Sequence, residues 1–249
     1  MSFTDQAIVL GARAHGEAHA LAELFTEAHG RWPALVHGGQ GRRMLPLLQA
    51  GNEVRAEWKG RSDSLGFFTI ELTKANAAAL IDDGLSLAAL QAATALARAC
   101  LPDREPHAGA FRAMKVLIEH LDAFEIWPIL MARWELGLLA ELGFGLTLDR
   151  CAATGAREDL IYVSPRSACA VSREAGAPYT DKLLPLPQFL IKPGADASIG
   201  DALSALTTTG YFLETRILHL AGRQLPEARV KLIALLEERL RLREAPDRG

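Results

Sequence analysis

The sequence predicts an α+β, multidomain protein in which a small β module precedes a larger helical domain. Between about residue 6 and residue 74, apolar residues alternate with a period of two, which is typical of half-buried strands. After residue 74 the period becomes helical, and alanine and leucine become frequent. A chain of 249 residues, 49% of them hydrophobic, can bury a sizeable core in one large domain or two modest ones. We expect a β domain over residues 1–78 and a helical domain over residues 79–243.

Five short strands are predicted in the β module. In residues 53–59 the alternation places Val54, Ala56 and Trp58 on one face. Glycine-containing turns separate the other runs, which lie at residues 8–13, 21–26, 32–37 and 67–72. Residues 44–48 fit one helical turn that plugs an open end of the sheet. Five strands with such a plug predict a Greek-key barrel of the oligonucleotide-binding (OB) type.

The helical domain is expected to begin with a helix that Ser86 caps. This helix ends near Cys100, because Pro102 disfavours helical geometry in the residue before it. Apolar residues at three- and four-residue steps predict the remaining helices, at residues 111–121, 127–142, 199–206 and 212–220, with a last one that opens at Pro226. The tail beyond Arg241 is expected to fray.

Residues 150–190 interrupt the helical pattern with several glycines and prolines. We therefore expect a loop-rich insertion in the helical domain, with a short strand at residues 160–163.

Bulk properties favour a soluble protein of the cytoplasm. Apolar runs end before the roughly 18 residues that a membrane-spanning helix needs, and the N-terminus shows no secretion signal. Three cysteines, an odd number, are expected to be reduced thiols. A formal net charge of −3 argues against coating of nucleic acid through overall charge, so local basic patches would have to bind it.

No motif supports catalysis. The glycine-rich stretch 38–43 lacks the Gly-Lys-Ser/Thr ending of a phosphate-binding loop, and no Gly-x-Ser-x-Gly elbow or His-Glu-x-x-His helix occurs. We expect no enzyme activity.

We interpret residues 38–43 instead as a basic loop at a barrel rim, where Arg42 and Arg43 are expected to bind phosphate oxygens. An ordinary solvated loop is the open alternative. Other basic side chains of the β module complete the candidate DNA-binding set: Arg13, Arg31, Arg42, Arg43, Arg55, Lys59 and Arg61. Aromatic side chains could stack on bases, but a place in the core is favoured for each of them: Phe25, Trp32, Phe67 and Phe68.

Several stretches together resemble the RecO family of bacterial recombination mediators. They are residues 7–17 (AIVLGARAHGE), 27–31 (EAHGR), 38–43 (GGQGRR) leading into 45–51 (LPLLQAG), 134–144 (WELGLLAELGF) and 151–155 (CAATG). The resemblance implies an N-terminal OB barrel and a helical domain. It also implies binding of single- and double-stranded DNA, strand annealing and, with RecR, loading of recombinase onto DNA covered by single-strand-binding protein.

Partners are expected on the same grounds: DNA, RecR and single-strand-binding protein, at a cytoplasmic, nucleoid-associated location and not at a membrane. The acidic tail of a single-strand-binding protein would need an apolar pocket with a basic rim. Candidates for that rim are Arg112, Lys115, Arg133 and Arg216.

Many members of the family carry a four-cysteine zinc site in the helical domain. By resemblance, Cys151 matches the first ligand, but Thr154 stands at the second position and the last pair falls near Ser172 and Ala175, with Cys169 out of register. We therefore expect a degenerate zinc-finger-like insertion that binds no zinc and is held by packing and hydrogen bonds.

A rival interpretation keeps the family but changes the role. Acidic and basic residues are matched in number in the β module. The chain could therefore be an interaction scaffold of the recombination machinery with little DNA affinity of its own.

Overall fold

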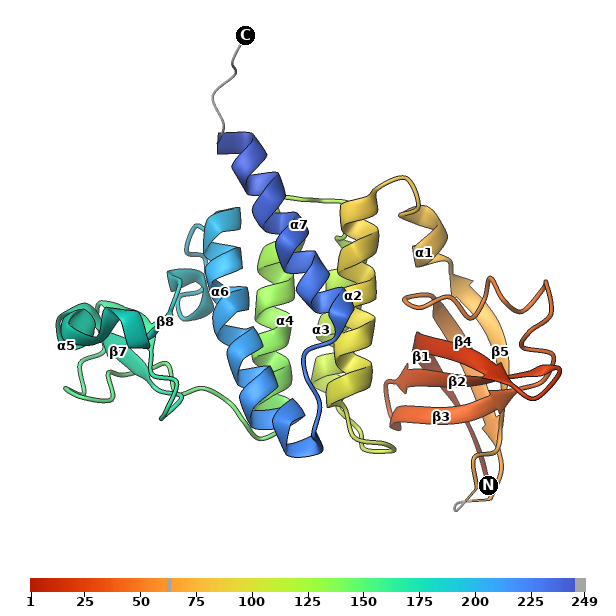
Figure 1. Cartoon of the computed structure of the whole chain (residues 1–249). Helices are drawn as coiled ribbons and strands as arrows, with labels where there is room; N and C mark the ends of the chain where they lie inside the picture. Colours follow the sequence, from red (N-terminus) through yellow and green to blue (C-terminus); the bar gives the residue numbers. More distant parts are fainter. Residues whose placement is uncertain (62–63, 245–249) are drawn as a thin grey trace, which may run out of the picture. The chain divides into compact units, whose positions relative to one another are not determined.

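A computed structural model describes residues 1–61 and 64–244 (Figure 1). It confirms the α+β class, with a five-stranded sheet followed by helices. The chain divides into two compact units. The first comprises residues 1–122 and 226–232, and the second comprises residues 123–225 and the chain from Ile233 onward.

The five strands form a closed barrel in the order β1-β2-β3-β5-β4, drawn in red to orange in Figure 1. They are β1 (Ser2–His15), β2 (His19–Thr26), β3 (Gly30–Val36), β4 (Glu53–Lys59) and β5 (Phe67–Lys74). The barrel closes because the long strand β1 pairs with both β2 and β4. A register shift between Val9 and Gly11 marks the irregularity at which a strand can bend from one neighbour to the other. The predicted OB-type barrel is confirmed.

Alternation places one face of every strand in the barrel core. Small residues such as Ala22 and Ala34 leave room there for Trp58. The predicted plug at residues 44–48 consists of hydrogen-bonded turns, in which the amides of Leu47 and Leu48 donate to the Met44 carbonyl. These turns bury Leu48 in the barrel core.

Three helices follow in the first unit: α1 (Asn76–Ala79), α2 (Gly84–Cys100) and α3 (Ala108–Glu119). The prediction that Ser86 caps α2 was wrong. Asp83 is the N-cap, and its carboxylate accepts hydrogen bonds from the backbone N–H groups of Leu85 and Ser86. Aspartate caps at least as well as serine, and here it stands three residues earlier.

The second unit is built on α4 (Trp127–Glu141) and α6 (Ile199–Phe212), which pack on each other. Predicted helices at residues 199–206 and 212–220 are in fact one continuous helical stretch. Its far end is a π-helical segment (Leu213–Leu218) and a 3-10 turn (His219–Ala221). The threonines that separate the two predicted helices do not break the stretch, because the Thr207 and Thr209 hydroxyls donate to carbonyls of the preceding turn.

The last helix, α7 (Glu227–Glu244), opens after Pro226 as predicted and continues past Arg241. The rest of the predicted fraying tail lies outside the described residues. In the part of the chain that the structure describes, no helix combines the length and apolar character needed to cross a membrane.

The insertion forms a three-stranded sheet in the order β7-β6-β8, drawn in teal in Figure 1. Its strands are β6 (Leu160–Val163), β7 (Ala170–Ser172) and β8 (Leu184–Pro185), which confirms the predicted strand at residues 160–163. Short helical turns complete it: α5 (Arg173–Gly176), η1 (Ala177–Lys182) and η2 (Gln188–Leu190).

Candidate nucleic-acid interface

The basic loop is pinned to the turn between β1 and β2. The Gln40 side-chain amide donates to the carbonyls of Gly16 and His19, both at 2.9 Å. Gly39 lies so close to β2 that an added Cβ would stand 2.5 Å from the Cβ of Ala20, which explains the glycine. The loop that carries the predicted arginines therefore has a fixed root.

Arg42 and Arg43 are both exposed on this loop. Neither side chain makes a hydrogen bond or ion pair with any residue that the structure describes. Arg13, on β1, is likewise exposed and without a partner among residues 1–61 and 64–244. Arg13 and Gln40 line the same cavity of about 270 Å³, so Arg13 lies beside the root of the basic loop. Their guanidinium groups are available to phosphate oxygens.

Arg31 is placed differently. Its guanidinium lies 2.7 Å from Glu23 and 3.0 Å from Asp103, and its side chain is only 15% exposed. A phosphate would have to displace these carboxylates, so the geometry favours a structural role for Arg31.

The three remaining candidates of the β module lie on or just after β4. Arg55 stands opposite Glu71 in register and shares a shallow hollow of about 230 Å³ with Glu57. The Lys59 ammonium lies 2.8 Å from the Glu57 carboxylate, and Arg61 is exposed just beyond the strand. Carboxylates therefore dilute the positive charge here.

Phe25 and Phe68 are buried, and Trp32 packs half-buried against the barrel core. Phe67 differs from them, because 38% of its surface is exposed. Alternation along β5 explains the difference, since adjacent residues point to opposite faces.

The candidate partner-binding residues fall in both units. On α3, Arg112 and Lys115 each lie 3.4 Å from a barrel carboxylate, Glu27 and Glu53 respectively. In the second unit, Arg133 donates to the Phe189 carbonyl at 3.1 Å. Arg216 of that unit donates to the carbonyl of Arg166 at 2.8 Å. All four side chains thus already contact other residues of their own unit.

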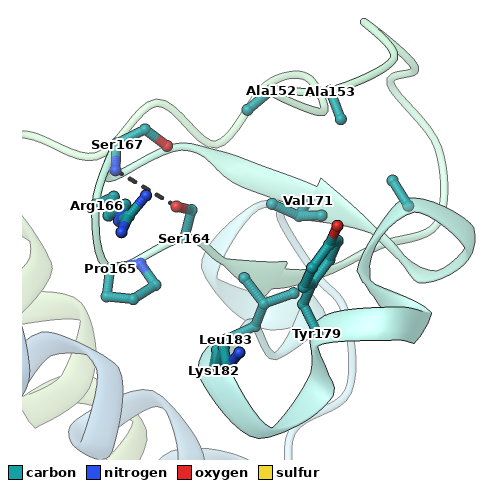
Figure 2. Close-up of a pocket in the computed structure, with 11 residues that line it drawn as sticks. Ala152, Ala153, Ser164, Pro165, Arg166, Ser167, Val171, Tyr179, Lys182 and Leu183 are labelled. Atoms are coloured by element: carbon teal, nitrogen blue, oxygen red, sulfur yellow. Dashed lines mark hydrogen bonds between the residues drawn. The ribbon is translucent and has the colours of Figure 1, made fainter.

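Sequence reasoning missed a cavity of about 530 Å³ in the insertion (Figure 2). Figure 2 shows Val171, Tyr179 and Leu183 gathered at one side of it. The cationic side chains of Arg166 and Lys182 also line it. No sequence motif signals this cavity, because its lining comes from loops, one strand and short helical turns that the fold of the insertion brings together.

Cys151, near the start of the insertion, is buried, with 2% of its surface exposed. Its sulfur accepts hydrogen bonds from the Ser172 backbone N–H at 3.3 Å and from the Ser172 hydroxyl at 3.4 Å. Burial raises the pKa of the Cys151 thiol, but hydrogen bonds from Ser172 and Thr154 outweigh it and lower that pKa from 9.0 to about 6.

This arrangement does not fit a zinc site. The family resemblance points to four positions, and they offer one thiol, the hydroxyls of Thr154 and Ser172, and the methyl group of Ala175, where a structural zinc needs four thiolate or imidazole ligands. Within the described residues, no three His, Cys, Asp or Glu side chains cluster as metal ligands do.

Comparison with known proteins covers both parts of the chain. The family model "Recombination protein O N terminal" matches residues 1–76, and "Recombination protein O C terminal" matches residues 81–225. A DNA repair protein RecO of Phenylobacterium zucineum is 49% identical over 243 residues, which cover 97% of this chain and 100% of the relative. Relatives of the same name from Caulobacter vibrioides (49% identity, 96% of this chain, 98% of the relative) and Methylorubrum extorquens (47%, 94% and 98%) are similar over nearly their whole length. The chain therefore belongs to the recombination protein O (RecO) family.

Proposed function

We propose that this protein is a non-catalytic mediator of DNA repair and homologous recombination, whose barrel binds single- and double-stranded DNA through backbone phosphates. Family membership supports the repair role. The observation that carries the DNA-binding part is the pair Arg42 and Arg43, exposed and unpaired among the described residues on a loop with a fixed root. Phosphate contacts of this kind give affinity without sequence reading.

The proposal extends to strand annealing and, with RecR, to the loading of recombinase onto DNA covered by single-strand-binding protein. Neutralising phosphates lowers the repulsion between two complementary strands, which favours annealing. For partner docking, the insertion cavity offers the combination that an acidic peptide tail needs, because Val171 and Leu183 supply an apolar wall and Arg166 and Lys182 supply charge. Such work places the protein in the cytoplasm, at the nucleoid.

The test is DNA affinity as a function of salt for the Arg42→Ala, Arg43→Ala double variant. Each phosphate contact to a single strand contributes about 0.7 to the slope of log K against log salt, so the double variant should lower the slope by about 1.4. Binding and annealing should weaken at every salt concentration. A matched control, Arg150→Ala with Arg157→Ala, removes the same charge from the exposed surface of the insertion and should leave the slope unchanged.

Salt-insensitive binding by the wild-type protein would contradict the proposal. The scaffold alternative predicts that the double variant anneals strands as well as the wild type does. Under that alternative, capture of RecR or of single-strand-binding protein would be the activity that survives.

A further inference from the structure

The barrel register aligns one residue from each strand in a single row across its surface. Arg13 pairs with Leu21, and Leu21 pairs with Leu35. Leu35 pairs in turn with Phe67, and Phe67 with Lys59. Directly opposed residues project from the same face of a sheet, so these five side chains form a continuous row. We call Arg13, Leu21, Leu35, Phe67 and Lys59 the outer row.

The row faces away from the core. The next residues along the strands, Ala20, Ala34 and Phe68, are buried in the barrel interior. In the row itself, Arg13 and Lys59 are exposed, and the leucines between them are half-buried. Phe67 exposes 38% of its surface, whereas its neighbour Phe68 exposes 3%.

Two histidines extend the aromatic surface of Phe67. The His37 ring stacks on the Phe67 ring with centroids 4.1 Å apart and an interplanar angle of 5°. The His19 ring stands edge-on to His37 at 4.8 Å. These ring contacts hold the Phe67 ring in place at the surface. A base that stacks on it therefore pays a smaller entropic cost for ordering the side chain.

Arg98 of helix α2 contacts the neighbouring row of the barrel surface. Glu23 is the register partner of Gly11. Arg98 of α2 donates to the Glu23 carboxylate at 2.8 Å, and its guanidinium nitrogen lies 3.6 Å from where a Cβ on Gly11 would be. The outer row is the next outward-facing row of β1 and β2, since Arg13 lies two residues after Gly11 and Leu21 lies two residues before Glu23.

The row combines positive charge with apolar and aromatic surface, which is the combination that binds single-stranded nucleic acid. Cations stand at both ends, and a planar ring with an apolar floor stands between them. The Lys59 pair with Glu57 is a solvent-exposed one, which holds the ammonium weakly and leaves it open to exchange for phosphate. A duplex hides the faces of its bases, whereas a single strand offers them for stacking.

We propose that the outer row is a base-stacking platform for single-stranded DNA, in which Phe67, backed by His37, takes the face of an unpaired base while Arg13 and Lys59 hold flanking phosphates. The inference rests on the proposed DNA-binding function and deepens it. It predicts that the protein prefers single strands to duplex DNA and assigns this preference to one aromatic side chain, separate from the phosphate contacts of Arg42 and Arg43.

The experiment compares three probes of equal length, about 15 nucleotides, within the usual site size of an OB barrel. They are oligothymidylate, an abasic strand with the same phosphates, and a duplex. The wild-type protein should bind oligothymidylate on the order of tenfold more tightly than the abasic strand, because stacking needs a base. Phe67→Leu and Phe67→Ala should abolish this preference and leave affinity for the abasic strand and the duplex unchanged.

Leu72→Ala is the matched control, because Leu72 is also an exposed apolar residue of β5 and lies outside the row. Phe67→Leu keeps apolar volume on the strand, and thermal unfolding of both variants checks that the barrel remains folded. Phe67 variants that retain the tenfold preference would overturn the platform while leaving phosphate binding intact. A wild-type protein that binds none of the three probes would instead overturn the proposed function itself.

Discussion

At the scale of single residues, Cys151 is a thiol whose ionisation depends on two hydroxyl-bearing neighbours. Its pKa is lowered to about 6 because hydrogen bonds from Ser172 and Thr154 outweigh the effect of burial. By sequence these neighbours stand where other family members are expected to have zinc ligands. Hydrogen bonds to sulfur thus join Cys151, near the start of the insertion, to Ser172 of β7, two of the positions that a metal would otherwise join.

The first prediction concerns the pH dependence that follows from this thiol. A folded-state pKa of about 6 against 9.0 for the free group means that stability rises with pH between these values and is lost as pH falls through 6. Cys151→Ala should lower the free energy of unfolding by about 1–3 kcal/mol at pH 8, because Ser172 loses its acceptor. The difference in free energy of unfolding between Cys151→Ala and the wild type should be smaller at pH 6 than at pH 8. Urea titrations at the two pH values would measure it.

Cys169→Ser is the control for this prediction, because the Cys169 thiol donates to the Ser167 carbonyl and to no other group among the described residues. It should preserve the wild-type rise of stability with pH. Metal analysis of the purified protein belongs to the same experiment: we propose that it contains no stoichiometric zinc, and a full equivalent of zinc bound at Cys151 would contradict this account.

At the scale of elements, a cluster of ion pairs joins the barrel to the helices of the first unit. Glu23 of β2 contacts Arg31 of β3 at 2.7 Å and Arg98 of α2 at 2.6 Å. Partial burial raises the pKa of Glu23, but the two guanidinium groups outweigh it and hold the pKa below 4.5. Asp103, which follows α2, closes the cluster on Arg31.

The second prediction is that Glu23→Gln destabilises the protein by about 1–3 kcal/mol at pH 7, because two partly buried guanidinium groups lose their shared carboxylate. A lowered pKa contributes stability that is present above pH 4.5 and lost as pH falls through the folded-state value. The difference between variant and wild type should therefore vanish in acid. Glu57→Gln, which removes only the exposed pair with Lys59, should cost no more than about 1 kcal/mol at either pH.

Strands were easier to predict from sequence than helix boundaries were. Each barrel strand buries one face, so its alternation is visible in the residue pattern, as at Val54, Ala56 and Trp58. Helix limits depend on competing local hydrogen bonds. Asp83 is the cap where Ser86 was expected, and the hydroxyl of Thr207 donates to the Leu203 carbonyl within α6, where a break was expected.

The candidate site was predictable only where it depends on residue type. A glycine-rich basic loop identifies Arg42 and Arg43 as candidates without structural knowledge. Whether a cation is free or paired depends on contacts between residues distant in sequence, as the pairing of Arg31 with Asp103 shows. Exposure of Phe67 likewise depends on which face of β5 turns inward, and its stacking on His37 depends on the parallel pairing of β3 with β5.

At the scale of the whole molecule, the two proposed binding functions lie in different compact units. The cations proposed for DNA belong to the first unit, and the insertion cavity belongs to the second. The net charge of −3 means that neither function follows from overall attraction, so each depends on its own local group of side chains. Variants in one unit should therefore leave the other function intact.

The last prediction tests this separation with the double variant Tyr179→Ala, Lys182→Ala. Both residues line the cavity, and Tyr179 is 55% exposed, so truncation removes an aromatic contact and a cation with little effect on folding. Affinity for an acidic C-terminal peptide of single-strand-binding protein should fall on the order of tenfold, measured by fluorescence anisotropy, because about 1.4 kcal/mol of lost contact corresponds to tenfold in Kd. Annealing of naked complementary strands should be unchanged.

The Arg42→Ala, Arg43→Ala variant should show the reverse pattern, with weakened annealing and normal peptide affinity. If either variant lost both activities while remaining folded, DNA and the partner would bind one shared surface. The proposed separation of the two binding functions between the units would then be wrong.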